Sequence, residues 1–239
     1  MDLNGKRIVL LGGTSGLGFA TAQAAAKEGA KVVVASSRGS SVDNALLQLP
    51  SDAEGYMLDL SSEKAIISFF NSIGEFDHLV YTAGEAIQLI NLDDLEIDNA
   101  RNYFNLRYWG AVMAVKYGSK FIKPGGSIVL TGGIASLRPG AGWSLGASIC
   151  GAMEGLTRAF AVELSPIRVN AVSPGVVKTN LWTSIPEDDR ESMYENIGNS
   201  LLVKRVGESD DLAKAYLFLM KEEFISGQVI VVDGGAVLV

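Results

Sequence analysis

The chain has 239 residues, of which 48% are hydrophobic and 20% are charged, which suits one folded α/β domain over residues 1–239 and argues against disorder. Its formal net charge of −7 argues against a surface for nucleic acid or anionic lipid, and no apolar run reaches the roughly 20 residues that span a bilayer. A single cysteine and a single histidine exclude an internal disulfide, a multi-cysteine metal site and a histidine-based triad, so we expect no metal and a reduced, cytoplasmic setting.

Strand-like and helix-like segments alternate along the whole chain. The strand candidates are rich in Val, Ile and Leu without polar alternation, which is typical of strands buried on both faces of a parallel sheet. The repeated order with short links predicts an α/β fold: a doubly wound, seven-stranded parallel sheet with helices on both faces, the Rossmann architecture. The expected strands are Arg7–Leu11, Lys31–Ala35, Gly55–Leu58, His78–Thr82, Ser127–Thr131, Arg168–Val172 and Gln228–Val232. The expected helices include Leu17–Glu28, Ser62–Ile73, Ile97–Phe121, Ala147–Leu164 and Asp210–Met220.

A glycine-rich turn separates the first expected strand from the first expected helix. Gly12, Gly16 and Gly18 give this turn a G-x-x-x-G-x-G spacing. Such glycines let the backbone approach a pyrophosphate, and the helix N-terminus favours the negative charge. A plain tight bend is the alternative, but the position between a strand and a helix favours dinucleotide binding. The expected cofactor contacts of the turn are Gly12, Thr14, Ser15, Gly16, Leu17 and Gly18.

The second expected strand ends with residues that favour NADP(H) over NAD(H). Sites that prefer NAD usually place an acidic residue here to bind the ribose 2′-hydroxyl. This chain instead has Ser36, followed by Ser37 and Arg38, which offer hydroxyls and a guanidinium to a 2′-phosphate. The alternative is that Arg38 is an exposed loop arginine without a ligand. The absence of an acidic residue and the presence of Arg38 both favour a cofactor with a 2′-phosphate, so we expect NADP(H).

Further segments match a known family: Tyr81-Thr-Ala-Gly84, Asn105, residues 168–175 and residues 232–235. With the glycine turn, they make the chain resemble the short-chain dehydrogenase/reductase superfamily over nearly its whole length. The resemblance implies additional cofactor contacts at the adenine, at the adenine ribose and at the nicotinamide carboxamide. The contacts at the adenine are Asp59 and Leu60, and those at the adenine ribose are Ala83 and Gly84. The contacts at the nicotinamide carboxamide are Pro174, Gly175, Val177 and Thr179. The resemblance also implies a homodimer or homotetramer.

The family's usual proton relay is absent from this sequence. Family members usually carry Tyr-x-x-x-Lys at the start of a helix, where the tyrosine exchanges a proton with the substrate and the lysine holds the nicotinamide ribose. Alignment on residues 154–158 puts Gly146 at the tyrosine position and Cys150 at the lysine position. No lysine occurs from residue 124 to 177 and no tyrosine from 118 to 193, so a small shift of the alignment does not restore the pair.

The family's serine, which polarises the substrate oxygen, normally ends the fifth strand. Its position falls on Gly133, or on Thr131 if the register slips by two residues. The catalytic candidates that remain are Asn105, which matches the family's mid-helix asparagine, and Arg107, Trp143 and Ser144.

Each of these groups has a structural alternative. Trp143 suits a pocket wall as well as a participant in the reaction. Arg107 suits a surface or interface ion pair as well as a partner for an oxyanion. Cys150 suits a small core residue better than a thiolate nucleophile, and His78 suits a structural role.

Residues 180–202 interrupt the alternation of strands and helices and include the charged run 187–191. They lie where the family has a mobile lobe over the substrate. We expect either such a substrate-covering lobe or a solvated surface helix, and the two can coexist.

Three functions remain open from the sequence. The first is an NADP(H)-dependent oxidoreductase with an altered proton path, acting on a small carbonyl or imine-like molecule. Loss of a positioned acid or base costs about 10²–10⁴ in rate without abolishing hydride transfer, and an iminium acceptor needs no tyrosine. The second is a catalytically degenerate NADP(H)-binding sensor. The third is a non-redox isomerase, lyase or cyclase that uses the same pocket.

Overall fold

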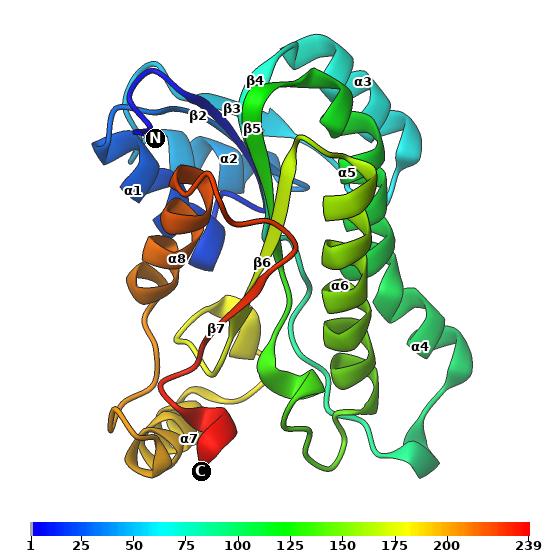
Figure 1. Cartoon of the computed structure of the whole chain (residues 1–239). Helices are drawn as coiled ribbons and strands as arrows, with labels where there is room; N and C mark the ends of the chain where they lie inside the picture. Colours follow the sequence, from blue (N-terminus) through cyan, green and yellow to red (C-terminus); the bar gives the residue numbers. More distant parts are fainter. Residues whose placement is uncertain (1) are drawn as a thin grey trace.

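Seven parallel strands form the central sheet of the computed structural model, which describes residues 2–239 (Figure 1). The strands are β1 (Arg7–Leu11), β2 (Lys31–Ser36), β3 (Glu54–Met57), β4 (Phe76–Tyr81), β5 (Ile122–Thr131), β6 (Arg168–Pro174) and β7 (Val229–Val232). Their order in the sheet is β3-β2-β1-β4-β5-β6-β7, so the strand order reverses between β1 and β4. The predicted doubly wound Rossmann architecture is confirmed.

Helices cover both faces of the sheet and create two separate cores. One layer holds α1 (Gly16–Lys27), α2 (Gly39–Leu46) and α8 (Ser209–Lys221), and the other holds α3 (Glu63–Ile73), α5 (Ala111–Gly118) and α6 (Ser144–Glu163). Within β1, Ile8 and Leu10 face the first layer, whereas Val9 and Leu11 face the second. Alternate strand residues point to opposite faces, so both sets must be apolar. No helix within residues 2–239 combines the length and the apolar character that a bilayer crossing needs.

Most predicted strands agree with the observed strands to within two residues, and β5 is the exception. The prediction starts at Ser127, whereas β5 starts at Ile122. Ile122 pairs with Phe76 and Ser127 pairs with His78, so the pairing register shifts between them. Residues 123–126 absorb this shift and contain a proline and two glycines, which do not signal a strand in sequence.

The predicted single helix over 97–121 is wrong, because the structure divides this segment. It comprises α4 (Ile97–Phe104), a π-helical turn η2 (Asn105–Gly110), α5 and a 3₁₀ turn η3 (Ser119–Phe121). The Tyr81 hydroxyl, at the end of β4, donates to the Leu106 carbonyl at 2.6 Å. Gly110 leaves room for it, since a Cβ there would overlap the Tyr81 hydroxyl oxygen. A tertiary hydrogen bond therefore supports the π turn, and the periodicity of the sequence does not reveal it.

Residues 180–202, here called the lobe, lie beyond the carboxyl ends of the strands (Figure 1). The lobe contains a 3₁₀ turn, η5 (Asn180–Trp182), and helix α7 (Glu187–Ser200). Trp182 and Tyr194 are buried and form a third apolar cluster with Val206. The first turn of α7 carries three acidic residues. The lobe thus combines a buried aromatic face with a solvated outer face.

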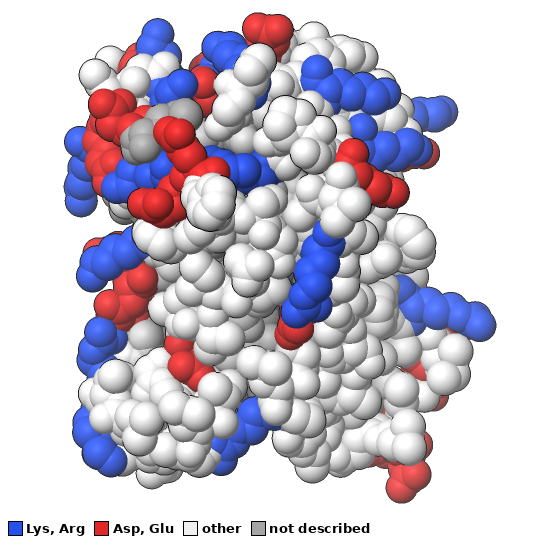
Figure 2. Space-filling model, viewed as in Figure 1, with Lys and Arg blue, Asp and Glu red and all other residues white. Residues whose placement is uncertain are grey.

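Most charged side chains on the face drawn in Figure 2 lie around a broad, mainly uncharged area, which a basic and an acidic side chain interrupt near its middle. Lys and Arg side chains are interspersed with Asp and Glu around its edge (Figure 2). Exposed apolar side chains on the whole molecule include Val162 of α6, Val231 of β7 and Leu238 near the C-terminus. Surface of this kind can support contact between protein subunits.

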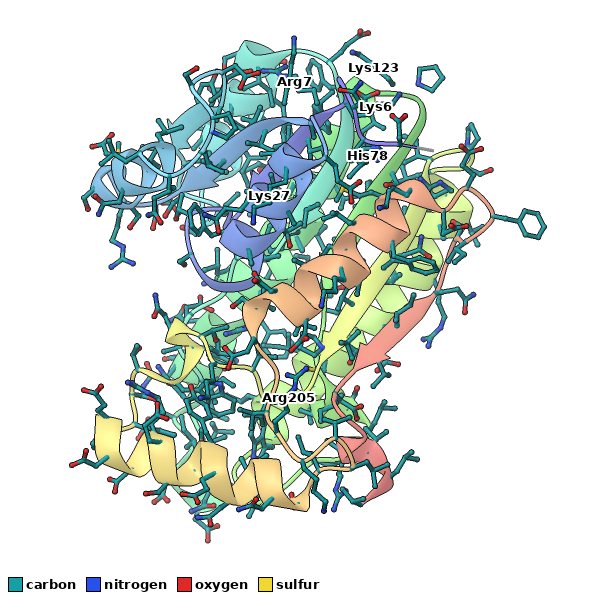
Figure 3. All side chains as sticks on the ribbon, turned by 90° about the vertical axis from the view of Figure 1, so that its left-hand side faces the viewer. Lys6, Arg7, Lys27, His78, Lys123 and Arg205 are labelled. Atoms are coloured by element: carbon teal, nitrogen blue, oxygen red, sulfur yellow. The ribbon has the colours of Figure 1, made fainter. Side chains whose placement is uncertain are left out.

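His78 lies toward the amino-terminal end of the sheet, at the opposite end of the molecule from α7 (Figure 3). Its side chain is fully buried, and Nδ1 lies 2.9 Å from the Ser127 hydroxyl oxygen. Burial lowers the pKa of His78 to about 4. The imidazole is therefore neutral at physiological pH, which fits a structural role.

Candidate active site

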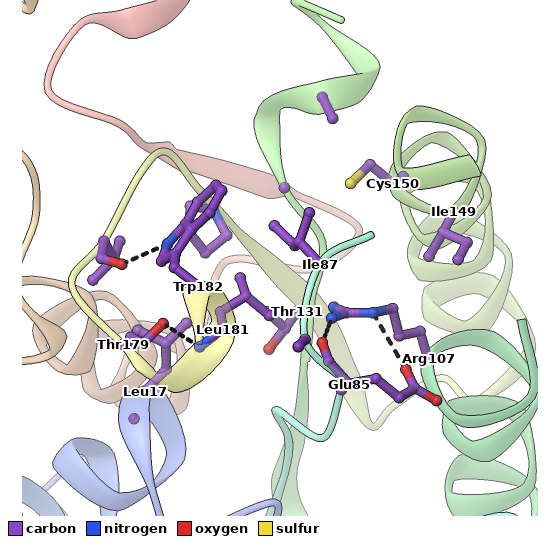
Figure 4. A pocket seen from close by; sticks show the side chains of 18 of the residues that line it. Leu17, Glu85, Ile87, Arg107, Thr131, Ile149, Cys150, Thr179, Leu181 and Trp182 are labelled. Carbon is purple, nitrogen blue, oxygen red and sulfur yellow. Dashed lines mark hydrogen bonds and ion pairs between the residues drawn. The ribbon is translucent and has the colours of Figure 1, made fainter. Parts of the chain in front are cut away.

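A pocket of about 920 Å³ lies at the carboxyl ends of the central strands, where the strand order reverses (Figure 4). Ligands of open α/β sheets bind at this point. Residues 179–183 line one side of the pocket, and residues of α6 and η2 line the other. The predicted site residues that the structure brings together here are Ser15, Gly16, Leu17, Arg38, Ala83, Gly84, Arg107, Trp143, Pro174, Gly175, Val177 and Thr179.

Two glycines allow the turn between β1 and α1 to close against the end of β4. Gly12 has a φ of +87°, and a Cβ there would lie 2.6 Å from the Ala83 nitrogen. A Cβ on Gly18 would overlap the Gly12 carbonyl oxygen and the Thr82 hydroxyl oxygen. Larger residues at either position would push the turn away from β4.

The start of α1 presents backbone donors to the pocket. The first N–H groups of a helix have no acceptor within the helix, and the Ser15 side chain does not cap them. No acidic residue lies in the first turn, and Ser15, Gly16 and Leu17 line the pocket. Unpaired donors at the positive end of a helix dipole fit a phosphate group. This arrangement fits the pyrophosphate of a dinucleotide.

The end of β2 brings a cation to the pocket without an acid beside it. Ser36 ends the strand, and Ser37 and Arg38 are exposed. Arg38 lines the pocket, and its guanidinium has no hydrogen-bond or ion-pair partner within residues 2–239. A guanidinium next to two hydroxyl groups fits an extra phosphate on the adenine ribose.

Some predicted cofactor residues do not line the pocket: Gly12, Thr14, Gly18, Ser36, Ser37, Asp59 and Leu60. Gly12 and Gly18 contribute through the shape of the turn. Asp59 is exposed, and its Oδ1 accepts hydrogen bonds from the Ser61 hydroxyl at 2.7 Å and the Ser61 N–H at 2.9 Å. These bonds lower the pKa of Asp59 and hold its carboxylate in a local turn. Leu60 is buried in the core.

Gly133, Gly146 and Cys150, the positions aligned with the family's relay, all line the pocket. A Cβ on Gly133 would lie 3.0 Å from Cys150 Sγ, so the end of β5 and the second turn of α6 meet here. Burial raises the pKa of the Cys150 thiol, and the nearby Arg107 charge lowers it by less. The thiol is therefore protonated at neutral pH, which argues against a thiolate nucleophile.

The indole of Trp143 lies beside Gly146. A Cβ on Gly146 would lie 3.3 Å from Trp143 Cε3. The Trp143 ring meets the Trp182 ring edge to face, with centroids 6.4 Å apart. Trp182 Nε1 in turn donates to the Val177 carbonyl at 3.0 Å. Trp143 thus forms an aromatic wall between α6 and the lobe.

Thr131 also lines the pocket, but its hydroxyl is already used within the fold. Oγ1 donates to the Tyr81 carbonyl at 2.7 Å and lies 2.6 Å from the Tyr216 hydroxyl oxygen. Of the two positions considered for the family's serine, Thr131 therefore has an engaged hydroxyl and Gly133 has no side chain.

Asn105 and Arg107 face different surroundings because they lie in the π-helical turn. Asn105 is exposed, its Nδ2 donates to Asn102 Oδ1 at 3.3 Å, and it does not line the pocket. Arg107 lines the pocket and points from η2 toward Glu85 (Figure 4). The expectation that Asn105 reaches the pocket is therefore corrected, because the π turn changes which residue faces the sheet.

Ser144 also lies outside the pocket lining, contrary to expectation. It is the first residue of α6, it is exposed, and its carbonyl accepts a hydrogen bond from the Ser148 hydroxyl at 2.7 Å. Residues two apart in an α-helix point about 200° apart. The helix register that turns Gly146 and Cys150 inward therefore turns Ser144 outward.

The titratable side chains that line the pocket are Arg38, Glu85, Tyr103, Arg107, Arg138 and Cys150. Within residues 2–239, no lysine, histidine or aspartate lines this pocket. In the same part of the chain, no three His, Cys, Asp or Glu side chains are arranged to hold a metal ion. Arg138 donates to the Ala236 carbonyl at the rim. Charge inside the pocket therefore comes from arginines and one glutamate.

Sequence reasoning missed several residues that complete the pocket. The Ile87 N–H donates to the Leu181 carbonyl at 3.0 Å and joins the loop after β4 to the lobe. Glu85 and Tyr103 line the pocket from the β4 loop and from α4. The signal that could have found the lobe residues is the pair Leu181-Trp182, which stands out as apolar before a polar segment.

Residues 12–237 match the family model described as Enoyl-(Acyl carrier protein) reductase. The short-chain dehydrogenase/reductase ucsE of Acremonium sp is 34% identical over 255 residues, which cover 99% of this chain and 97% of that protein. The short-chain dehydrogenase/reductase malC of Malbranchea aurantiaca is 30% identical over 253 residues, which cover 99% and 96%.

Solved structures agree with these relatives. A small-chain dehydrogenase in complex with NADPH is 40% identical with a TM-score of 0.87, and the match covers 99% of this chain and 100% of that one. The structure of MalC Reductase/Diels-Alderase from Malbranchea aurantiaca is 31% identical with a TM-score of 0.92, covering 99% and 98%. Sheet order, glycine turn and relatives together show that this chain belongs to the short-chain dehydrogenase/reductase superfamily.

Proposed function

We propose that this protein is an NADP(H)-dependent oxidoreductase of the short-chain dehydrogenase/reductase type that works without the family's usual Ser, Tyr and Lys. It acts on a small carbonyl or imine-like molecule. One observation carries the proposal: the glycine-rich turn and helix N-terminus that fit a dinucleotide lie beside three positions without a hydroxyl or amine that could exchange a proton. These positions are Gly133, Gly146 and Cys150.

The proposed cofactor is NADP(H). The start of α1 fits a pyrophosphate, and Arg38 has no protein partner within residues 2–239, as a 2′-phosphate site requires. The solved structure that is 40% identical is a complex with NADPH. The loop after β6, through Val177 and Thr179, lines the pocket and would hold the nicotinamide end. When bound, NADPH supplies the hydride that reduces the substrate.

The side chains around Gly133 favour an acceptor that needs no proton during reduction. The Cys150 thiol is half-buried and protonated, and the Thr131 hydroxyl is engaged within the fold. A ketone oxygen must gain a proton as it is reduced, whereas an iminium carbon already carries positive charge. Without a positioned acid, ketone reduction loses about 10²–10⁴ in rate. The pocket therefore suits an imine-like acceptor better than a ketone.

We also propose that the lobe covers the substrate. Leu181 and Trp182 line the pocket, and the Ile87–Leu181 hydrogen bond joins the lobe to the β4 loop. Trp143 and Trp182 give this side an aromatic wall. Such a cover excludes water from the reacting atoms and binds a partly apolar substrate.

Transfer of deuterium from stereospecifically labelled [4-²H]NADPH tests this function. The acceptors are cyclic imines, N-alkyl iminium salts and the matching cyclic ketones, and mass spectrometry of the products detects the label. We expect label in the amine products, with ketones slower than the iminium salts by at least about 100-fold. Tight NADPH binding without transfer to any acceptor would instead favour a sensor protein. Absence of NADPH binding would contradict both functions.

A non-redox, ring-forming reaction is the second candidate. It is favoured by the likeness to the structure described as MalC Reductase/Diels-Alderase. Apolar side chains of Ile87, Ile149 and Leu181 line the pocket, and a reaction guided by shape needs no proton relay. Product formation that continues without nucleotide would identify this activity. A strict requirement for NADPH oxidation would assign the first function.

We propose, finally, a homodimer or homotetramer that works in the cytoplasm. The outer side of α6 carries small and apolar residues next to the exposed Arg158: a Cβ on Gly155 would meet nothing within 4 Å, and Val162 is 80% exposed. The single cysteine is free, which suits a reducing compartment. Light scattering after size exclusion measures the assembly. A monomer at every concentration would contradict the proposed oligomer.

A further inference from the structure

The Arg107 guanidinium lies directly against the backbone of Gly84 in the pocket. A Cβ on Gly84 would lie 2.7 Å from Arg107 Nη1 and 2.8 Å from Cζ. Gly84 follows the strand that contacts the cofactor turn, and both residues line the pocket. Because residue 84 is a glycine, the guanidinium can lie directly against the backbone at this place.

The protein fixes one side of this guanidinium and leaves the other free. Arg107 Nη2 donates to the Glu85 carbonyl, and Nε lies 3.5 Å from Glu85 Oε2. Arg107 Cζ lies 5.8 Å from the centre of the Tyr103 ring, one helical turn earlier. Within residues 2–239, Nη1 donates to no protein group. The guanidinium is therefore held in place with donors left for a ligand.

The charge of Arg107 also reaches Cys150, on the opposite helix. Its positive charge lowers the pKa of the Cys150 thiol, although the larger effect of burial raises that pKa. Cys150 Sγ in turn lies 3.0 Å from the position of a Cβ on Gly133. Arg107 and Cys150 therefore approach the same part of the pocket from η2 and from α6 (Figure 4).

We propose that Arg107 replaces the lysine that the family places at the position of Cys150. From the π-helical turn, it supplies a fixed positive charge on the side of the pocket that faces Cys150, where the family's lysine would hold the nicotinamide ribose. The inference rests on the proposed function, because it requires NADP(H) in the pocket. Arg107 would then contact the cofactor from η2, whereas the family's lysine lies on the helix that corresponds to α6.

A cation at this place must distinguish the two redox forms of the cofactor. The nicotinamide ring of NADP⁺ is positively charged, whereas that of NADPH is neutral. Arg107 therefore weakens NADP⁺ binding relative to NADPH binding and favours release of the oxidised cofactor. A residue that only supports the fold would affect both forms equally.

Titration of the full-length protein with NADPH and with NADP⁺ measures this discrimination. We expect Arg107→Gln to lower the ratio of Kd(NADP⁺) to Kd(NADPH) at least about fivefold, the size expected for unit charges about 4 Å apart with the screening of bulk water. The matched control is Arg101→Gln, because Arg101 of α4 is 76% exposed in its side chain and pairs with Asp98. This control should leave the ratio unchanged within about twofold.

Returning a cation to α6 tests the replacement itself. The double variant Arg107→Gln, Cys150→Lys should restore the ratio to within about twofold of the original protein, because it moves the charge and does not remove it. Cys150→Lys alone places two cations together and should raise the ratio. A double variant that keeps the low ratio of Arg107→Gln would overturn the proposal.

Glu85→Gln provides a second test that keeps Arg107 in place, in case Arg107→Gln does not fold. It removes the carboxylate next to Nε, so the ratio should rise. An unchanged ratio of Kd(NADP⁺) to Kd(NADPH) in Arg107→Gln or in Glu85→Gln, with tight binding of both nucleotides, would overturn the role of Arg107. The proposed function would not be affected by that result. Failure of the original protein to bind either nucleotide overturns both.

Discussion

The two halves of the pocket present different kinds of chemical group to a ligand. The cofactor half, at the turn after β1 and the end of β2, uses glycines, backbone donors and Arg38, whose guanidinium has no partner within residues 2–239. The other half, between β5 and α6, presents two glycines, a thiol and an indole, and takes its charge from η2. The comparison teaches that backbone geometry for a dinucleotide and side-chain chemistry for a substrate can change independently in one fold.

Gly18→Val should break the cofactor half and produce the largest effect. Its Cβ would overlap the Gly12 carbonyl and the Thr82 hydroxyl, so the turn must move away from β4. We expect NADPH affinity to fall at least about 100-fold and the free energy of unfolding to fall by about 1–3 kcal/mol. Fluorescence titration and thermal unfolding measure the two quantities.

Gly155→Ala is the control for nucleotide binding, because Gly155 lies on the outer side of α6 and does not line the pocket. It should bind NADPH with the affinity of the original protein. Normal NADPH affinity in Gly18→Val would contradict the assignment of this turn.

Restoring the family's side chains should convert the second half toward ordinary ketone reduction. In the Arg107→Gln background, we combine Gly133→Ser, Gly146→Tyr and Cys150→Lys, and then add Trp143→Ala. Trp143→Ala removes the indole beside Gly146 and so makes room for the new tyrosine. The set with Trp143→Ala should therefore reduce ketones at least about tenfold faster, which is part of the 10²–10⁴ that acid catalysis supplies. NADPH oxidation at 340 nm follows the reaction.

The comparison between these two sets isolates the role of Trp143. We expect the set that keeps Trp143 to gain less, because the indole obstructs the new tyrosine. Folded variants with no gain in either set would count against the alignment of Gly146 and Cys150 with the family's relay.

Arg38→Gln sharpens the comparison within the cofactor half. Loss of charge-assisted hydrogen bonds to the 2′-phosphate should lower NADPH affinity roughly tenfold or more and leave NADH affinity within about twofold. Paired titrations with the two nucleotides measure this. Arg158→Gln is the control, since this exposed α6 arginine pairs with Glu154. Equal losses for both nucleotides in Arg38→Gln would contradict a 2′-phosphate site.

His78 should have the smallest effect on the pocket and a clear effect on stability. Its folded pKa of about 4 lies below the usual 6.5, so between these values the unfolded chain binds more protons. Stability should therefore fall by roughly 3 kcal/mol as pH drops from 6.5 to 4. Urea unfolding across this range should show a shallower fall in His78→Gln, with NADPH affinity unchanged. An identical pH dependence in both proteins would refute this account of His78.

Local sequence patterns were sufficient for most of the fold. Runs such as Val32–Ala35 are apolar at every position, which only a strand buried on both faces explains well. They were insufficient over 97–121, where the π turn depends on the bond from Tyr81 to the Leu106 carbonyl. Those two residues are 25 positions apart, and no periodicity connects them.

Predictions about the site also succeeded where they depended on local sequence and failed where they depended on contacts between distant residues. The turn at Gly12–Gly18 is local, so the sequence located it correctly. Which of Asn105 and Arg107 faces the pocket depends on the π turn, and the sequence alone did not exclude Asn105. The contact of the Trp143 indole with Trp182 of the lobe joins residues 39 positions apart, so the sequence pattern does not reveal it.

The rate ratio for a matched pair of acceptors tests the central claim most directly. A cyclic N-alkyl iminium salt and the ketone of the same ring are each reduced under single-turnover conditions with saturating NADPH. The account predicts that the iminium reacts at least about 100-fold faster, because no positioned acid serves the ketone oxygen. Reduction of the ketone at an equal or greater rate would contradict the claim that this pocket works without the family's proton relay.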